Sequence, residues 1–170
     1  MKIKVKVLNE KCMPKISKNG DWIDLKSSKD IIIGAAQSGV LKRDHNNSYR
    51  NVNIPVYYIP LGVAIQLPSG YEAVINARSS NPKNGLFIPN GQGVIDNSYC
   101  GDSDEWKLVC SPLFSTEIKE GQRICQFRVQ LSQKATFWQK LKWLFSSKIE
   151  LEQVKTLNNP NRGGFGSTGK

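Results

Sequence analysis

Short apolar runs with a period of two, separated by glycine, proline and asparagine, constrain the fold of this chain most. Ile3, Val5 and Val7 alternate with lysines, which predicts a half-buried strand. Residues 63–67 repeat the pattern and lead through a Pro-Ser-Gly turn to residues 74–77, so we expect these two segments to pair as a hairpin. Further strands are predicted at 31–33, 108–110 and 127–131. Because no strand–helix–strand alternation separates these runs, the pattern indicates an all-β sandwich or barrel.

The length of 170 residues suits one domain with its own hydrophobic core. We expect residues 1–158 to form this domain, and residues 159–170, which lack hydrophobic periodicity, to form an extended, flexible glycine-rich arm. The formal net charge of +10 predicts an anionic partner. Charge alone does not choose among a nucleotide, a nucleic acid and an acidic membrane surface.

Two segments lack the period-two pattern of the predicted strands. Residues 34–53 are polar and turn-rich without a clear period, and we expect a loop insertion there. Residues 136–148 predict an added short helix, at about 137–146, whose apolar residues share one face. These residues are Phe137, Trp138, Leu141, Leu144 and Phe145. A basic aromatic helix can touch a membrane, but packing on the body or on a sister subunit is the favoured interpretation.

The cysteines and the single histidine argue against a structural zinc site. Four cysteines occur without a C-x-x-C pair, and zinc needs clustered thiolates or imidazoles. The first residues lack the apolar run of a secretory signal, and no apolar stretch is long enough to span a bilayer. We therefore expect a cytoplasmic protein with free thiols and no membrane partner.

The segment Arg162-Gly-Gly-Phe-Gly-Ser-Thr-Gly169 is the most informative one for function. Its glycines let the backbone approach a ligand closely, and successive N–H groups can hold an anion. Arg162 adds a cation able to bind phosphate with two hydrogen bonds. Phe165 has no use in a phosphate loop but can stack on a base, so the segment indicates a nucleotide. The alternative is a disordered Gly/Ser end.

Three other segments contain candidate site residues. Residues 90–101 lead through glycines to a Val-Ile pair and Asp96, and a carboxylate at a strand end can orient and deprotonate a water. The alternative is a hairpin whose aspartate caps a turn. Arg78-Ser79-Ser80 and residues 120–126 each offer phosphate contacts, with a surface turn as the alternative for each.

Together, these segments resemble the ordered motifs of the trimeric all-β dUTPase family over almost the whole chain. The second motif matches residues 78–80, the third 93–101, the fourth 121–126 and the fifth 162–169. The first is present only as Asp-Trp-Ile-Asp-Leu at 21–25. Within the family, the chain looks most like the phage-borne enzymes.

The resemblance implies a distorted jelly-roll, or β-sandwich, and a homotrimer with three active sites at the subunit interfaces. In such a trimer one subunit gives the third motif, and another gives the second and fourth. The third subunit gives the tail, which is the glycine-rich arm of residues 159–170. It implies hydrolysis of dUTP to dUMP and pyrophosphate by in-line water attack at the α-phosphorus, with Mg²⁺. This activity keeps uracil out of DNA and supplies dUMP for dTMP synthesis.

The resemblance also assigns residue roles. Asp96 matches the base that activates water, and Asp24 would contact the metal through water only. The matched phosphate-binding positions are Arg78, Ser79, Ser80 and Gln126. The matched uracil-reading positions are Asn90, Gly93, Val94 and Ile95, and Tyr99 lies under the sugar. The tail contributes Arg162 on the γ-phosphate, Phe165 over uracil, and Gly166 and Ser167, while Lys107 is a further substrate contact.

Departures from the family pattern leave alternatives open. Trp22 is too large to copy the usual close backbone approach of the first motif, and the Arg162–Phe165 spacing is short. A dCTP deaminase of the same fold would need a glutamate after the third motif, and Glu105 is near but in a different context. Another alternative is a trimer that binds a host regulatory protein through residues 34–53 or the added helix. A specific nucleic-acid partner is not expected.

Overall fold

The computed structural model describes residues 1–44, 47–145 and 148–165, with the backbone alone over most of 38–52. Two short 3-10 helices lie at Glu10–Cys12 and Asn81–Asn84, and the α-helix α1 spans Phe137–Phe145. The strands are β1 (Lys2–Val7), β2 (Ile23–Lys26), β3 (Ile31–Ile33), β4 (Gln37–Asp44), β5 (Asn47–Asn53), β6 (Tyr57–Pro60), β7 (Val63–Gln66), β8 (Tyr71–Ala77), β9 (Leu86–Phe87), β10 (Gly93–Asp96), β11 (Lys107–Pro112), β12 (Thr116–Ile118), β13 (Arg123–Leu131) and β14 (Glu150–Val154).

An antiparallel four-stranded sheet in the order β10-β8-β13-β2 holds three of the four best-matched segments. β8 is an inner strand of this sheet, with β10 on one side and β13 on the other. Cys125, Phe127 and Val129 on β13 are buried, as expected for a strand that turns alternate residues toward a core. This sheet therefore fixes the position of the Asp96 segment relative to the Arg-Ser-Ser segment.

The remaining sheets complete the body. β14 and β7 flank β1, β6 and β9 flank β11, and β3 pairs with β12. Ile3 and Val5 are fully buried while Lys2 and Lys4 are exposed, which confirms the half-buried first strand. At the centre of the core the Trp106 ring meets the Phe127 ring edge-on, with centroids 5.2 Å apart. The mostly β architecture confirms the predicted fold class.

The predicted strands are all present, but one predicted pairing is wrong. Residues 63–67 and 74–77 do not form a hairpin: β7 pairs with β1, whereas β8 pairs with β10 and β13. The Pro-Ser-Gly turn exists, with Gly70 at φ 82°. The turn carries the chain from one sheet to another, and hydrophobic alternation identifies a strand without identifying its partner.

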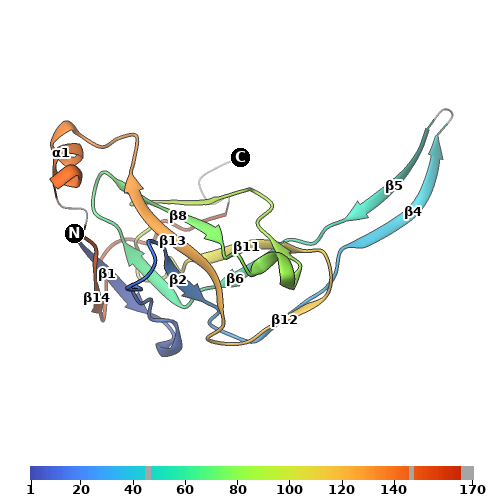
Figure 1. The fold of residues 1–170 in the computed structure, drawn as a ribbon, viewed down its shortest axis with the longest axis horizontal. Coiled ribbons are helices and arrows are strands. Elements are labelled where there is room, and N and C mark those ends of the chain that lie inside the picture. Colours follow the sequence, from blue (N-terminus) through green and yellow to red (C-terminus); the bar gives the residue numbers. More distant parts are fainter. Residues whose placement is uncertain (45–46, 146–147, 166–170) are drawn as a thin grey trace.

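The paired strands β4 and β5 lie where we expected a loop insertion over residues 34–53. β4 and β5 pair with each other, and the ribbon extends well beyond the body (Figure 1). A two-stranded ribbon outside the core needs no buried face, so the hydrophobic period that marks a strand is missing from its sequence. The expectation of an insertion at this place agrees with this projection.

The added helix is confirmed at Phe137–Phe145, close to its predicted bounds. None of its residues is buried. The Trp143 ring packs on Tyr71 at 5.5 Å, and the Gln139 amide donates to the Ser69 carbonyl at 2.8 Å. Among the described residues, no helix has the length and apolar character needed to cross a membrane.

Candidate active site

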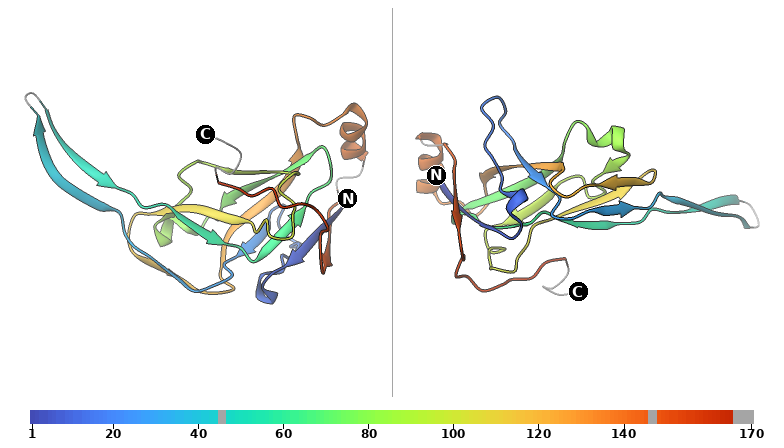
Figure 2. Two further views of the ribbon diagram at one scale, coloured as in Figure 1. Left: turned by 180° about the vertical axis from the view of Figure 1, so that it is seen from behind. Right: turned by 90° about the horizontal axis from the view of Figure 1, so that it is seen from below.

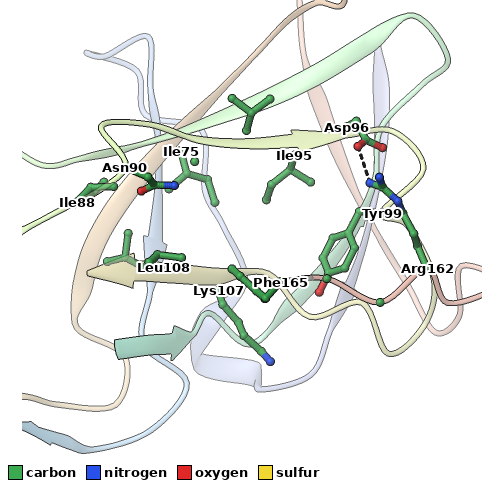
Figure 3. A pocket seen from close by; sticks show the side chains of 15 residues that line it. Ile75, Ile88, Asn90, Ile95, Asp96, Tyr99, Lys107, Leu108, Arg162 and Phe165 are labelled. Carbon is green, nitrogen blue, oxygen red and sulfur yellow. Dashed lines mark hydrogen bonds and ion pairs between the residues drawn. The ribbon is translucent and has the colours of Figure 1, made fainter. Parts of the chain in front are cut away.

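A pocket of about 260 Å³ lies beside β10 and β11. Its apolar wall includes Ile75, Ile88 and Leu108. Figure 3 shows Asp96 and Arg162 facing each other at one end of the pocket and Asn90 at the other. Polar groups at the ends of an apolar slot can orient a ligand whose middle is flat and apolar.

Asp96 is the last residue of β10 and is held from two sides. Its Oδ1 accepts hydrogen bonds from the Ser98 backbone N–H at 2.9 Å and from the Ser98 hydroxyl. Its Oδ2 accepts one from the Arg162 guanidinium at 2.5 Å. Partial burial raises the pKa of Asp96, but the hydrogen bonds from Ser98 and Arg162 outweigh it and lower the pKa below its ordinary value. The carboxylate is therefore ionised at neutral pH.

Aromatic rings and a cation line the other side of the pocket. The Phe165 ring meets the Tyr58 ring edge-on at 4.7 Å, and the Lys107 ammonium lies 5.8 Å from the Phe165 centroid. The Tyr99 hydroxyl donates to the Glu105 carbonyl at 2.9 Å. Burial raises the pKa of Tyr99, so the ring carries a neutral phenol at the pocket wall.

A second cluster of predicted site residues lies elsewhere on the same sheet. Asp24 accepts from Arg78 Nε at 2.8 Å and from Arg123 at 3.0 Å, and the Gln126 amide donates to the Ala77 carbonyl. In the sheet register Asp96 pairs with Glu72, six residues before Arg78. At about 3.4 Å per residue, the two ends of β8 are separated by roughly 20 Å.

The structure thus divides the predicted site residues into two groups. The residues that line the pocket are Asn90, Gly93, Val94, Ile95, Asp96, Tyr99, Lys107, Arg162 and Phe165. The residues of the described chain that do not line it are Asp24, Arg78, Ser79, Ser80 and Gln126. Gly166 and Ser167 lie outside the described residues.

Three residues near the pocket were not predicted from the sequence. Ser98 follows Asp96 by two residues, a spacing typical of an aspartate that bonds its own turn, so a signal was present. Tyr58 and Asp104 meet the tail through contacts between segments distant in sequence, for which no local pattern exists.

The tail lies on the pocket of its own chain, whereas the family resemblance placed tail and third motif on different subunits. After β14 the chain runs back across the body (Figure 2), and Arg162, Gly163, Gly164 and Phe165 line the pocket. Hydrogen bonds between the tail and the loop after Gly101 hold it there. The space at Gly164 is small, because a Cβ there would lie 3.2 Å from the Tyr99 ring.

The position of Glu105 bears on the deaminase alternative. Its Oε1 accepts from the Gly62 backbone N–H at 2.8 Å, and its carboxylate caps that turn. Among the described residues that line the pocket, Glu105 is absent. A carboxylate used to hold a turn is not placed to shuttle protons to a base in the pocket.

An apolar slot, a ring able to stack, two cations and an ionised carboxylate define a site for an anionic aromatic ligand on an all-β domain. That description fits the class of nucleotide-hydrolysing β-proteins. Comparison with known proteins narrows the class further.

The family model of dUTPase matches residues 54–169. The SPbeta prophage-derived deoxyuridine 5'-triphosphate nucleotidohydrolase YosS of Bacillus subtilis is 40% identical over 172 residues, covering 99% of each chain. The corresponding enzyme of Hydrogenobaculum is 36% identical over 116 residues, 65% of this chain and 69% of that one. This chain belongs to the dUTPase family, and it is a dUTP diphosphatase.

Solved structures agree on the fold. The dUTPase of Streptococcus mutans superposes with a TM-score of 0.62 at 19% identity, covering 78% of this chain and 98% of that one. A mutant of the dUTPase from phage phi11 of S. aureus gives 0.60 at 16% identity, covering 79% of this chain and 94% of that one. The predicted dUTPase-like fold is therefore confirmed.

Proposed function

We propose that Asp96 is the general base with which this enzyme hydrolyses dUTP to dUMP and pyrophosphate. The observation that carries the proposal is the position of this ionised carboxylate at the mouth of a base-sized apolar slot, beside the tail cation. The three hydrogen bonds from Ser98 and Arg162 use three of the roughly four acceptor positions of a carboxylate. At least one position remains to orient a water.

In the proposed step, that water attacks the α-phosphorus in line with the bond to the leaving pyrophosphate. Asp96 takes the proton of the water as the new P–O bond forms and the old one breaks. The hydrogen bonds from Ser98 fix the direction of the carboxylate, so the water is held in a reactive orientation rather than recruited at random.

The edge of β10 suits recognition of uracil. β10 is an outer strand that pairs with β8 along one side, so backbone groups along its other side are outside that ladder. Fixed N–H and C=O groups near Val94 and Ile95 can match the uracil edge, and cytosine presents the opposite pattern. Thymine differs by one methyl group, which must be excluded by close packing against the slot.

The sugar and base are enclosed by two rings. Tyr99, which lines the pocket, is proposed to lie under the deoxyribose, where a 2′-hydroxyl would clash. Phe165 is proposed to cover uracil, and its edge-on contact with Tyr58 sets the direction of its ring. Lys107 and Arg162, which also line the pocket, supply positive charge.

The phosphate-binding cluster of Arg78, Ser79, Ser80 and Gln126 is proposed to act on the pocket of another subunit. About 20 Å of β8 separates this cluster from Asp96 in one chain. This distance is too large for the cluster and Asp96 of the same chain to act on one triphosphate. A symmetric assembly can bring one subunit's cluster to the next subunit's pocket. We therefore propose a homotrimer with shared sites.

The residues present fit a Mg²⁺ that is held mainly by substrate. The described residues contain no cluster of three or more His, Cys, Asp or Glu side chains that could bind a metal. Asp24 is a carboxylate of the kind that Mg²⁺ accepts, but both its oxygens bond arginines, so it would contact a hydrated ion through water. When bound, Mg²⁺ neutralises charge that develops on the phosphate oxygens.

We place the enzyme in the cytoplasm, or in the host cytoplasm for a phage-encoded chain. The four cysteines are unpaired, and Cys12, Cys110 and Cys125 are buried, an arrangement typical of a reducing compartment. There it would keep uracil out of DNA and supply dUMP for dTMP synthesis.

The test is a panel of dNTPs and UTP with Mg²⁺, with pyrophosphate release as the readout for wild-type enzyme and for Asp96→Asn. We expect dUTP to be strongly preferred, and the variant to keep nucleotide binding while losing turnover by a factor of about 10² to 10⁴. Near-wild-type release from Asp96→Asn would overturn the role of Asp96. Rapid ammonia release from dCTP would instead favour the deaminase alternative.

A further inference from the structure

The loop of residues 101–104, directly after the third motif, bonds the tail at several points, and we call it the tail cradle. Asp102 Oδ1 accepts from the Leu157 backbone N–H at 2.9 Å. The Ser103 backbone N–H donates to Asn161 Oδ1 at 2.8 Å. These bonds hold the chain from the end of β14 to the start of the glycine-rich segment.

Asp104 is the innermost group of the tail cradle and is 2% exposed. Its Oδ2 accepts from the Arg162 backbone N–H at 2.9 Å and from the Gly101 backbone N–H at 2.8 Å. Its Oδ1 accepts from the Gly163 backbone N–H at 3.0 Å. A buried carboxylate needs such donors, and hydrogen bonds to an ionised group are stronger than those to a neutral one. Two of the three donors belong to the tail.

Gly101 is the second element of the cradle. A Cβ at this position would lie 2.5 Å from the Asn161 Cα and 2.8 Å from its backbone nitrogen, and backbone atoms cannot turn aside as a side-chain tip can. Gly101 does not have the left-handed conformation of the glycines with positive φ. The missing side chain is therefore needed for the close approach of the tail and not for the local turn.

All of these bonds are made within the protein, so they do not require nucleotide. Hydrogen bonds from Leu157 and Thr156, together with Lys6, lower the pKa of Asp102 to about 2, and this group stays ionised throughout the physiological range. The tail is thus fixed to the body as far as Gly163. This fixed part includes Arg162, which contacts Asp96, and it ends shortly before Phe165.

We propose that Asp104 is a positioning residue that holds the tail backbone at Arg162 and Gly163. The absence of a side chain at Gly101 lets the tail approach closely enough for these bonds. The folded chain thereby places Arg162 and Phe165 at the nucleotide pocket before the substrate binds. The effect on catalysis rests on the proposed roles of Arg162 and Phe165; the docking of the tail does not.

The first test is hydrogen–deuterium exchange on the intact full-length enzyme. Asp104→Ala removes both hydrogen bonds from the tail and should speed the exchange of amides in 157–163 by about tenfold or more, because losing even one hydrogen bond to a charged group has about this effect. Asp104→Asn keeps one oxygen acceptor and should give an intermediate rate. Asp30→Ala removes another carboxylate that accepts a backbone N–H, from Glu120, and should leave 157–163 unchanged. Unchanged exchange in Asp104→Ala would overturn the proposal.

The second test is a double-mutant cycle that combines Asp104→Ala with deletion of residues 161–170. In the full-length enzyme, Asp104→Ala should weaken binding of a non-hydrolysable dUTP analogue by about tenfold or more. In the deleted enzyme the same substitution should have no effect, because its tail partners are gone. An equal loss in both backgrounds would show that Asp104 only shapes the pocket loop, and the proposal would fail.

Gly101→Ala keeps the proposal testable if Asp104→Ala does not fold. It should loosen 157–163 in the full-length enzyme and be neutral after the deletion, because the clash is with Asn161. A variant with a loosened tail and unchanged analogue affinity would support the cradle and contradict the proposed nucleotide contacts of Arg162 and Phe165. The two hypotheses can therefore fail separately.

Discussion

The two groups that hold Asp96 have different consequences for its basicity. Ser98 follows Asp96 in the same turn, so its two hydrogen bonds persist whatever the tail does. Arg162 belongs to the tail and is proposed to bind the γ-phosphate. When the phosphate takes the guanidinium, Asp96 loses one of the interactions that lower its pKa. The substrate itself would then make the carboxylate a stronger base.

Arg162→Gln should therefore raise the pKa of Asp96 in the substrate-free enzyme, because it removes the guanidinium that stabilises the charged form. The measurement is a ¹³C NMR titration of the Asp96 carboxyl group. Arg128→Gln is the matched control, since Arg128 packs over Trp22 instead. An unchanged or lower pKa of Asp96 in Arg162→Gln would contradict the prediction.

The same shift has a consequence for stability. The pKa of Asp96 is lower in the folded chain than in the unfolded one, so the ionised group stabilises the fold above about pH 4. This contribution is lost as the pH falls through the lowered folded value. Arg162→Gln should shrink it, because the folded and unfolded pKa values then lie closer together.

At the scale of elements, the sequence predicts those strands that have one buried face. β1 and β13 follow the period-two pattern over many residues, and helix α1 follows the helical period although none of its residues is buried. β2 and β12 were not predicted, although β2 buries alternate residues. The hairpin β4–β5 lies outside the core, so burial imposed no pattern on it.

The sequence likewise predicts only those site residues that belong to a local sequence pattern. Asp96 and Arg162 could be found because short motifs fix them relative to neighbouring glycines. Asp104 could not, because its role depends on backbone N–H groups almost sixty positions away, and a backbone donor leaves no mark in the sequence. Asn161 and Gly101 are linked in the same way, by a close approach that exists only in the folded chain.

The hairpin β4–β5 should be dispensable for folding and catalysis. Its strands pair only with each other among the described strands, and Gln37 lies opposite Asn53 at its base. Replacing residues 38–52 by an Asn-Gly turn should keep dUTP turnover and shift the Tm by no more than about 3 °C. Pyrophosphate release and calorimetry are the measurements. Loss of assembly in size-exclusion chromatography with light scattering would show instead that the hairpin joins subunits.

At the scale of the whole molecule, the proposed site residues of one chain form two separate groups. One end of β8 carries the pocket with Asp96, and the other end carries Arg78 and its hydroxyl neighbours. The order of the motifs along the sequence assigns both to one active site, but it does not reveal that one rigid strand keeps them apart. In the proposed homotrimer, a second copy of the chain supplies the other group.

Mixing two inactive variants tests this arrangement directly. Asp96→Asn lacks the base but keeps the Arg78 cluster, whereas Arg78→Ala keeps the base. In randomly mixed trimers, a site has an even chance of an intact base and, from another subunit, an even chance of an intact Arg78. About one quarter of all sites should then be intact, and all of these lie in trimers that contain both variants. Within such mixed trimers one site in three should be intact, so the isolated mixed assemblies should regain about a third of the wild-type activity.

The control is a pair of variants in the same group. Asp96 and Asn90 both line the pocket of one chain, so mixing Asp96→Asn with Asn90→Ala creates no intact pocket and should restore nothing. Co-expression with two different affinity tags, followed by isolation of doubly tagged assemblies, provides the mixed enzyme for pyrophosphate assays. If Asp96→Asn and Arg78→Ala fail to complement while doubly tagged assemblies form, both groups serve the same subunit's site. The roughly 20 Å between them would then have to be closed by a change in the sheet itself, which the continuous β8–β13 ladder opposes.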